Sequence, residues 1–257
     1  VKWTPFEGAT SYNVYVKGGK YADYTRIDRE LVRDYGSYGR ADMVGLPANV
    51  YALKVVPVID GTEDTASASE ATGMSVKAHD RSGFAFLRNT GTAPYDGSGI
   101  GAYKENGELK DNATVIYVTA ETAKTVTCKV FHDKAYKEFT GLQAIMDALQ
   151  KGTAKEPICV RIVGTIKKDD LDKILSSAEG LQIKGKNAYA PVNVTIEGIG
   201  DDATTWGFGF LIRNCSSVEM RNFANMCCMD DALSFDTQNA HCWVHHMDFF
   251  YGSTGGD

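Results

Sequence analysis

A short strand-like motif recurs at a fixed interval in the last third of the chain. NVTIEG begins at Asn193, SVEMRN at Ser217 and HCWVHH at His241, so that both offsets are 24 residues. Shorter apolar runs, 209–214 and 232–236, lie between these motifs about one repeat apart. Such a recurrence is typical of a coil of stacked parallel strands, in which each turn hydrogen-bonds to the backbone edge of the turn before it.

The recurrence also predicts which side chains face inward. Val194, Val218 and Cys242 hold equivalent positions in the three motifs. Because side chains alternate between the two faces of a strand, we expect these three residues to stack as a ladder inside the coil. Two earlier apolar runs, 158–166 and 181–185, predict strands of preceding turns.

The segment before these turns predicts a strand and then a helix. Residues 113–122 (ATVIYVTAET) are rich in β-branched residues, which favours a strand. The apolar residues of TGLQAIMDALQKG then follow helical spacing. Thr140 stands where an N-cap residue belongs, and Gly152 stands where a helix stops. We predict a helix over 140–150 that caps the open end of the coil.

The first 76 residues have a different pattern. Polar and apolar residues alternate in short runs between turn signals, most clearly at 11–17 and 51–60, which favours several antiparallel strands. This segment resembles the fibronectin type III family, with Trp3 as the core tryptophan and Tyr51 at the tyrosine corner. Since nothing precedes Trp3 to serve as the family's first strand, we expect the chain to begin inside this domain.

The predicted fold class is therefore all-β. A fibronectin type III-like β-sandwich over 1–76 is followed by a Gly- and Ser-rich linker or surface loop over 77–112. The N-terminal coils of a right-handed parallel β-helix, with a capping helix, then occupy 113–257. Because the last residues fall in a Gly-rich stretch, we expect later coils beyond Asp257.

Composition excludes some classes of partner. The net charge of −6 argues against nucleic acid, which favours a basic surface. No apolar run approaches the roughly 18–20 residues of a membrane-spanning helix. We expect no nucleic-acid partner, no membrane span and a monomer. The six cysteines form no CxxC pair and no zinc-ligand spacing with histidine, so we expect free thiols that pack as small apolar residues.

Four segments of the second part together resemble the first coils of the family 1 polysaccharide lyases, the pectate lyases. They are VTIEGIG at 194–200, GFGFLIRNCSSVEMRN at 207–222, DALSF at 231–235 and WVHH at 243–246. The resemblance implies cleavage of α-1,4-linked polygalacturonate, the de-esterified form of pectin, by calcium-assisted β-elimination. It also implies a secreted, periplasmic or cell-surface protein, because this polymer is too large to enter a cell.

The same resemblance places the candidate site residues. Asp231 matches an acidic calcium ligand of the family, and Ca²⁺ prefers oxygen ligands of this kind. The ion would neutralise the uronate charge that opposes carbanion formation. The family's second acidic ligand falls on Met229, so Asp230 is a weaker metal-ligand candidate and Asp257 is weaker still. The catalytic arginine is expected beyond the end of the chain, so no catalytic residue is assigned here and the chain alone is expected to be inactive.

Other interpretations of these residues stay open. Asp230 and Asp231 could instead accept backbone N–H bonds in a turn. His245 and His246 stand where the family has Asp-His, and we expect them on opposite faces of a strand, one of them interior or between coils, hydrogen-bonded and silent. A polygalacturonase would use paired aspartates as acid and base, but the Gly-His-Gly run expected one coil later is absent. A third alternative is a non-catalytic protein that binds pectin or another glycan.

Overall fold

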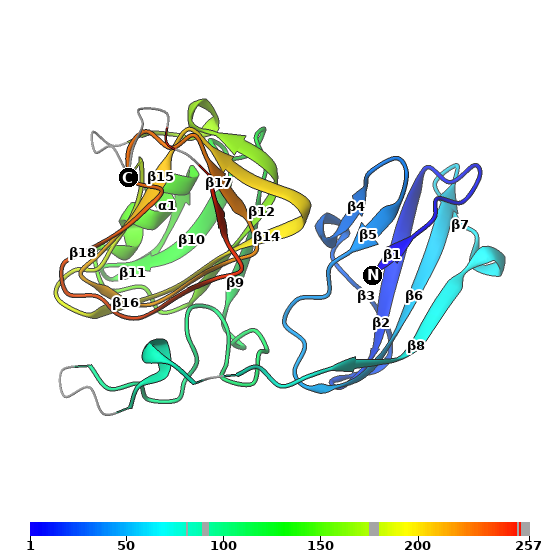
Figure 1. Ribbon diagram of the computed structural model, residues 1–257, viewed down its shortest axis with the longest axis horizontal. Coiled ribbons are helices and arrows are strands. Elements are labelled where there is room, and N and C mark those ends of the chain that lie inside the picture. Colours follow the sequence, from blue (N-terminus) through cyan, green and yellow to red (C-terminus); the bar gives the residue numbers. More distant parts are fainter. Residues whose placement is uncertain (81, 89–92, 175–179, 251, 253–257) are drawn as a thin grey trace. The chain divides into compact units, whose positions relative to one another are not determined.

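The computed structural model describes residues 1–80, 82–88, 93–174, 180–250 and 252, and its fold class is all-β. The described residues contain a single α-helix, and it is too short to cross a membrane. The chain divides into two compact units (Figure 1). The first comprises 1–80 with 106–108, and the second comprises 81–105 with 109–257.

The first unit is built from two antiparallel sheets. One has the strand order β1-β5-β4, and the other has the order β3-β2-β6-β7 with β8 also paired to β6. Val14 and Val55 of the larger sheet pack with Ala41 of the smaller one, so the core lies between the two sheets. The strands are β1 (Lys2–Trp3), β2 (Ser11–Gly18), β3 (Tyr21–Arg26), β4 (Val32–Asp34), β5 (Gly39–Ala41), β6 (Asn49–Ile59), β7 (Thr62–Glu63) and β8 (Ser69–Val76). The strands expected at 11–17 and 51–60 are therefore confirmed.

Tyr51 fixes the connection into β6. Its side chain is 2% exposed, and its hydroxyl donates a 2.9 Å hydrogen bond to the carbonyl of Pro47, four residues earlier. Trp3 is half-buried and packs edge-to-face on Tyr12 with ring centroids 5.2 Å apart. Tyr51 is therefore a core residue of this unit, whereas Trp3 is only partly in its core.

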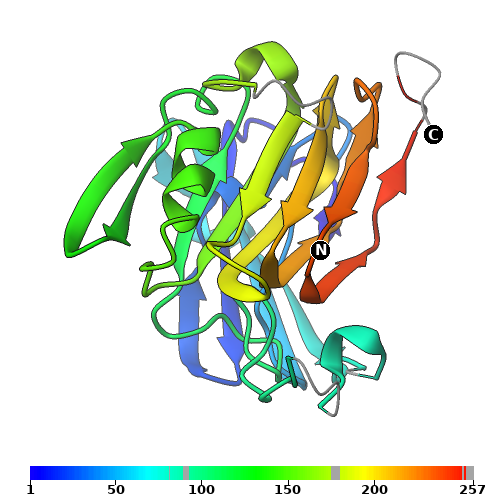
Figure 2. The ribbon, with the colours of Figure 1, turned by 90° about the vertical axis from the view of Figure 1, so that its left-hand side faces the viewer.

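The second unit contains a stack of parallel strands in two sheets (Figure 2). The first sheet has the order β9-β12-β14-β16-β19, with β17 paired to β14 and β20 paired to β17, and the second has the order β13-β15-β18. Their bounds are β9 (Thr114–Val118), β12 (Ile158–Lys167), β13 (Gly180–Lys184), β14 (Ala190–Trp206), β15 (Gly209–Arg213), β16 (Cys215–Arg221), β17 (Ala224–Met226), β18 (Leu233–Asp236), β19 (Ala240–His245) and β20 (Asp248–Phe249).

The predicted ladder of inward residues is confirmed. Val194 is in register with Val218, and Val218 is in register with Cys242. Val194 and Val218 are fully buried, whereas Cys242, on the last paired strand, is half-buried. All six cysteines of the chain are free thiols.

The corners of the stack recur with the strands. Asn193, Ser217 and His241 precede the three ladder residues, and each adopts a left-handed backbone with φ of 52°, 62° and 51°. This conformation is costly for a residue with a Cβ, and stacking it in successive turns keeps the chain bending at the same place. Gly198 allows two successive turns to approach closely, since a Cβ there would lie 2.1 Å from the carbonyl oxygen of Asn222 in the next turn.

The predicted helix is present as α1 (Leu142–Leu149), but Thr140 is not its N-cap. Thr140 ends β11 (Ala135–Thr140), which forms a hairpin with β10 (Thr127–His132) that the sequence did not predict. The carboxylate of Asp172 replaces the expected cap, because its two oxygens accept the N–H groups of Gln143 and Ala144 at 2.8 and 3.0 Å. A cap from so far along the chain leaves no local sequence signal.

Gln143 of α1 completes the free edge of the second sheet. Its side-chain amide accepts the backbone N–H of Gln182 at 2.9 Å and donates to the Gln182 carbonyl at 3.1 Å. The amide thus takes the place of a neighbouring strand beside β13. An edge strand with unpaired backbone groups is open to association with other chains, and this contact blocks it.

The segment expected as a linker is partly buried in the second unit. A short 3-10 helix, η3 (Phe84–Phe86), is followed by Ile100, Ala102 and Tyr103, which are at most 1% exposed. Tyr103 also forms an isolated antiparallel bridge with Leu109. Residues 100–103 therefore belong to the packing of the coil. Three further 3-10 helices are η1 (Arg29–Leu31), η2 (Thr65–Ser67) and η4 (Lys168–Asp170).

We predict that Tyr51→Phe destabilises the first unit by about 1 kcal/mol, because the Pro47 carbonyl loses its partner while the buried ring stays in place. Urea denaturation followed by tyrosine and tryptophan fluorescence measures this change. Tyr21→Phe is the control, since Tyr21 packs against the same apolar cluster as Tyr51 and its loss of a hydroxyl leaves the bond to Pro47 intact. Equal stability of the two variants would contradict the prediction.

Candidate functional site

The sequence-predicted aspartates lie where β18 begins. The Asp231 carboxylate accepts a 2.5 Å hydrogen bond from the hydroxyl of Ser234, so it is held by its own strand. The Asp230 side chain is exposed, and its backbone carbonyl accepts a hydrogen bond from the Cys228 thiol at 3.0 Å. Asp257 lies outside the described residues. Asp230 and Asp231 are neighbours in the sequence, but among the described residues their side chains share no hydrogen-bond partner that would join them in one site.

These residues do not assemble a calcium site by themselves. In the part of the chain that the structure describes, no three His, Cys, Asp or Glu side chains are grouped so that they could hold a metal ion. A hard cation such as Ca²⁺ needs several oxygen ligands at once, and Asp231 supplies at most two. The described residues thus do not fit a calcium ion, and the assignment of Asp231 as a metal ligand stays a prediction.

A row of charged side chains lies on the outer face of the second sheet, at the opposite end of β18 from Asp231. Lys184, Arg213 and Asp236 are in register on β13, β15 and β18, on the face opposite to the buried Ile183 and Ile212. Arg213 forms an ion pair with Asp236, and 42% and 34% of their side-chain surfaces are exposed. This row offers two cations to solvent next to a single carboxylate. Its charge suits an anionic ligand.

A second charged row, which the sequence did not predict, is buried on the first sheet. Arg161, Glu197 and Arg221 are in register on β12, β14 and β16. One Glu197 oxygen accepts from Arg161 Nε at 2.9 Å, and the other accepts from Arg221 Nη2 at 2.7 Å. The Tyr103 hydroxyl donates a third bond, at 2.6 Å, from the segment that covers the row. All four side chains are shielded, and Glu197 is 1% exposed.

Glu219 extends this buried network by one residue. It accepts from Arg221 at 3.3 Å, from Thr195 at 3.1 Å and from the His245 ring at 3.3 Å. The same covering segment is tied to the strands by its backbone, because the Ala102 N–H donates to the Thr195 hydroxyl at 2.9 Å. The network thus holds residues 101–103 against the sheet.

The electrostatics of the network are those of a structural clamp. Burial opposes the charged form of Glu197, but attraction from Arg221 and Arg161 outweighs it and lowers the pKa of the carboxyl. Burial and the neighbouring Glu197 raise the pKa of both the Tyr103 hydroxyl and the Cys159 thiol. A solvent-excluded carboxylate that is fully hydrogen-bonded has no position for a substrate. We therefore assign this network to stability.

The histidines of the last motif match the sequence expectation in part, because His245 is hydrogen-bonded between neighbouring turns. His245 lies on the outer face beside Glu219, stacked on Trp243 with ring centroids 3.8 Å apart, and His246 is an exposed corner residue with φ of 52°. Neither is in the interior, because the inward positions of β19 are Cys242 and Val244. The predicted alternation failed because the strand ends at His245.

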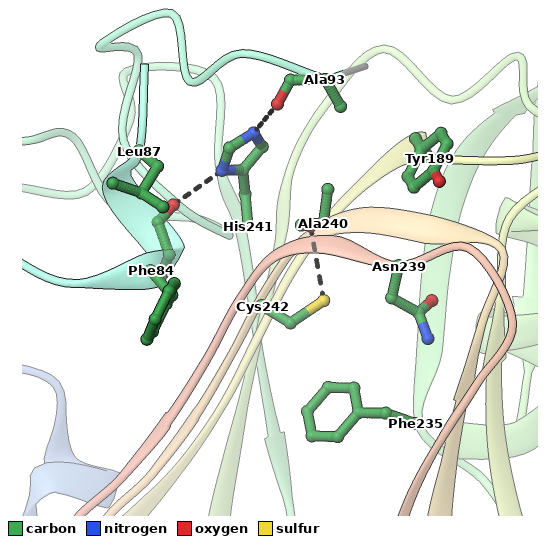
Figure 3. A pocket seen from close by; sticks show the side chains of 10 residues that line it. Phe84, Leu87, Ala93, Tyr189, Phe235, Asn239, Ala240, His241 and Cys242 are labelled. Atoms are coloured by element: carbon green, nitrogen blue, oxygen red, sulfur yellow. Dashed lines mark hydrogen bonds between the residues drawn. The ribbon is translucent and has the colours of Figure 1, made fainter. Parts of the chain in front are cut away.

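His241 connects β19 to residues 85 and 93, in the segment that begins with η3 (Figure 3). Its Nδ1 contacts the carbonyl oxygen of Ala85 at 2.7 Å, and its Nε2 contacts the carbonyl oxygen of Ala93. A cavity of about 540 Å³ opens beside it, lined by Phe84, Phe235, Cys242 and seven other residues. Since both ring nitrogens are occupied by carbonyls, His241 is not a free base.

In comparisons with known proteins, no family model, no curated protein and no solved structure matches the chain.

We predict that Glu197→Gln destabilises the second unit by about 3–5 kcal/mol, because two buried guanidinium groups lose their shared counter-charge. Since folding lowers the pKa of Glu197, the stabilisation is complete above about pH 5 and is lost as the pH falls further. The variant should therefore lose less stability than the wild type between pH 7 and about pH 4, as followed by thermal unfolding.

Glu138→Gln is the matched control for this prediction, because Glu138 is an exposed glutamate on β11 of the same unit. It should unfold at the wild-type temperature at both pH values. A Glu197→Gln protein that is as stable as this control would show that the ionic clamp does not contribute.

Proposed function

We propose that this chain is part of a β-helical polysaccharide lyase that acts on polygalacturonate by β-elimination. The parallel, in-register stack in the second unit supports a β-helix with α1 as its cap. The two antiparallel sheets and the Tyr51–Pro47 hydrogen bond support a fibronectin type III-like sandwich before it. The polymeric substrate supports export of the protein to the periplasm, the cell surface or the medium.

The observation that carries the functional part is the solvent-accessible row Lys184–Arg213–Asp236, at the opposite end of β18 from Asp231. Polygalacturonate presents one carboxylate per sugar, so its binding face needs cations at repeated intervals. Lys184 and Arg213 lie on neighbouring strands about 4.8 Å apart, on a face that solvent reaches. Their positive charges would also favour the carbanion that forms when the proton next to the uronate carboxylate is removed.

The reaction then proceeds without a change in oxidation state. A base takes the proton from the carbon next to the carboxylate, that electron pair forms a carbon–carbon double bond, and the glycosidic oxygen departs with the shortened chain. The described residues do not fit the calcium ion that the family resemblance implies, so we assign neither a metal step nor the proton transfer to a residue of this chain.

Binding without cleavage is the second candidate function. It is favoured by the same observation that no metal-holding group of three side chains occurs among the described residues. A β-helix with a sandwich module can present a glycan-binding surface with no chemistry. Hydrolysis has less support, since Asp230 is exposed while Asp231 is bonded to Ser234, and they form no facing acid–base pair.

Incubation of the full-length protein with polygalacturonate tests these functions against one another. We expect new ultraviolet absorbance from unsaturated sugar ends, because β-elimination creates a double bond conjugated with the carboxylate. Reducing ends without that absorbance would mean hydrolysis, and the absence of both would leave binding alone. The last two outcomes contradict the proposed lyase.

Asp231→Asn tests the remaining metal prediction. If Asp231 is a calcium ligand, the variant should need at least roughly tenfold more Ca²⁺ for half-maximal cleavage and bind Ca²⁺ correspondingly more weakly by calorimetry. Asp248→Asn, at an exposed aspartate of β20, should leave both values unchanged. An unchanged calcium requirement in Asp231→Asn would make Asp231 a turn residue that only bonds Ser234.

A further inference from the structure

A groove of about 750 Å³ follows one corner of the coil, on a different sheet from the Lys184–Arg213–Asp236 row. Its floor contains the left-handed corner residues Asn193, Ser217 and His241 of three successive turns. One wall comes from residues 93–112, which are part of the segment expected from the sequence to be a linker. The groove lies wholly within the second unit.

The floor of the groove repeats with the coil. Asn193 and Ser217 stand in neighbouring turns, so their polar side chains are about 4.8 Å apart. The ring of His241, whose nitrogens contact the Ala85 and Ala93 carbonyls, continues the floor in the next turn. Pro157, Pro191 and Tyr189 supply apolar surface between these polar groups. A regular series of polar groups with apolar surface between them suits an extended polymer of sugars better than a compact ligand.

The charge of the groove is opposite to that of the chain as a whole. Lys104, Lys110 and Lys155 line it together with Asp96 and Asp111, which leaves an excess of one positive charge in a chain of net charge −6. The ion pair of Lys104 with Asp111 is 2.6 Å long, but the Asp111 side chain is 90% exposed. Such exposed pairs contribute little, so a ligand carboxylate can replace Asp111 at little cost.

The walls are fixed before any ligand arrives. Gly101 N–H donates to the Ser217 hydroxyl at 2.9 Å, and the Lys110 ammonium donates to the Gly101 carbonyl at 2.9 Å. The buried Tyr103–Glu197 hydrogen bond anchors the same segment from below. A preformed groove loses little conformational entropy on binding, which favours affinity.

We infer that this groove binds an extended acidic oligosaccharide, with its sugar rings along the corner residues and its carboxylates at Lys104 and Lys155. The identity of the sugar as galacturonate rests on the proposed function. The groove would hold the polymer along the side of the coil, apart from the Lys184–Arg213–Asp236 row. It therefore adds a second binding site to the one proposed for cleavage.

Calorimetry with the full-length protein and an oligogalacturonate tests the inference. The double variant Lys104→Gln/Lys155→Gln should bind about tenfold more weakly than the wild type, and wild-type binding should weaken as salt rises. Lys124→Gln/Lys151→Gln is the matched control, because it removes two exposed lysines of the same unit outside the groove. It should bind as the wild type does.

Three results would overturn the inference. They are equal affinity in the two double variants, equal binding of a neutral galactose oligomer of the same length, and displacement of the oligogalacturonate by an equal concentration of inorganic phosphate. The assay for unsaturated ends separates this inference from the proposed function. Groove-dependent binding without unsaturated ends would retain the groove and reject the lyase. Unsaturated ends with groove-independent binding would retain the lyase and reject the groove.

Discussion

The buried carboxylate of Glu197 is the charged centre of the contacts that hold residues 101–103 to the strands. It lies between Arg161 and Arg221 and also accepts a hydrogen bond from Tyr103, so two guanidinium groups balance its charge. Buried ions are tolerated only when they are paired and hydrogen-bonded in this way, since an unpaired one is strongly destabilising. The contact joins residues 94 positions apart, and it gives residues 101–103 a fixed place on the strands.

The groove depends on that fixed place. The Gly101 N–H holds one wall of the groove in place by its hydrogen bond to the Ser217 hydroxyl, and the Gly101 carbonyl positions the Lys110 ammonium. A segment that was only a linker would leave the corner residues of the coil as a flat polar surface. The charged row on the second sheet, by contrast, needs only the strand register, because Lys184, Arg213 and Asp236 come from adjacent strands. The coil thus carries one polar surface that the stack alone creates and one that the buried clamp creates.

The sequence predicted the parts of the fold that repeat. The 24-residue recurrence predicted the Val194–Val218–Cys242 ladder because burial on one face of every turn requires an apolar residue at the same position. It could not predict that Asp172 caps α1, since that contact is not local. The buried ionic row did leave a signal, in that Glu197 and Arg221 occupy equivalent outward positions one repeat apart. The sequence did not predict that residues 101–103 cover these side chains. Gly and Ser in residues 77–112 favour a loop, and this signal is the same for a packed loop and a free one.

The candidate site was predictable only in part, for the same reason. The resemblance located Asp231 at the start of a strand, and the structure places it there, but a metal site needs further ligands that a single motif does not identify. No motif in the sequence marks Lys184 or Arg213 as a site residue. Their significance comes from register, which brings residues from separate repeats onto one face.

Amide hydrogen exchange at Gly101 and Ala102 tests most directly whether the covering segment is part of the coil. Both N–H groups donate to side chains of the stack, those of Ser217 and Thr195. They should therefore exchange as slowly as the amides in the middle of β14, because only opening of the buried clamp exposes them. Exchange as fast as at the exposed Asn106 would contradict the account, since the segment would then be a free linker and the groove would have no second wall.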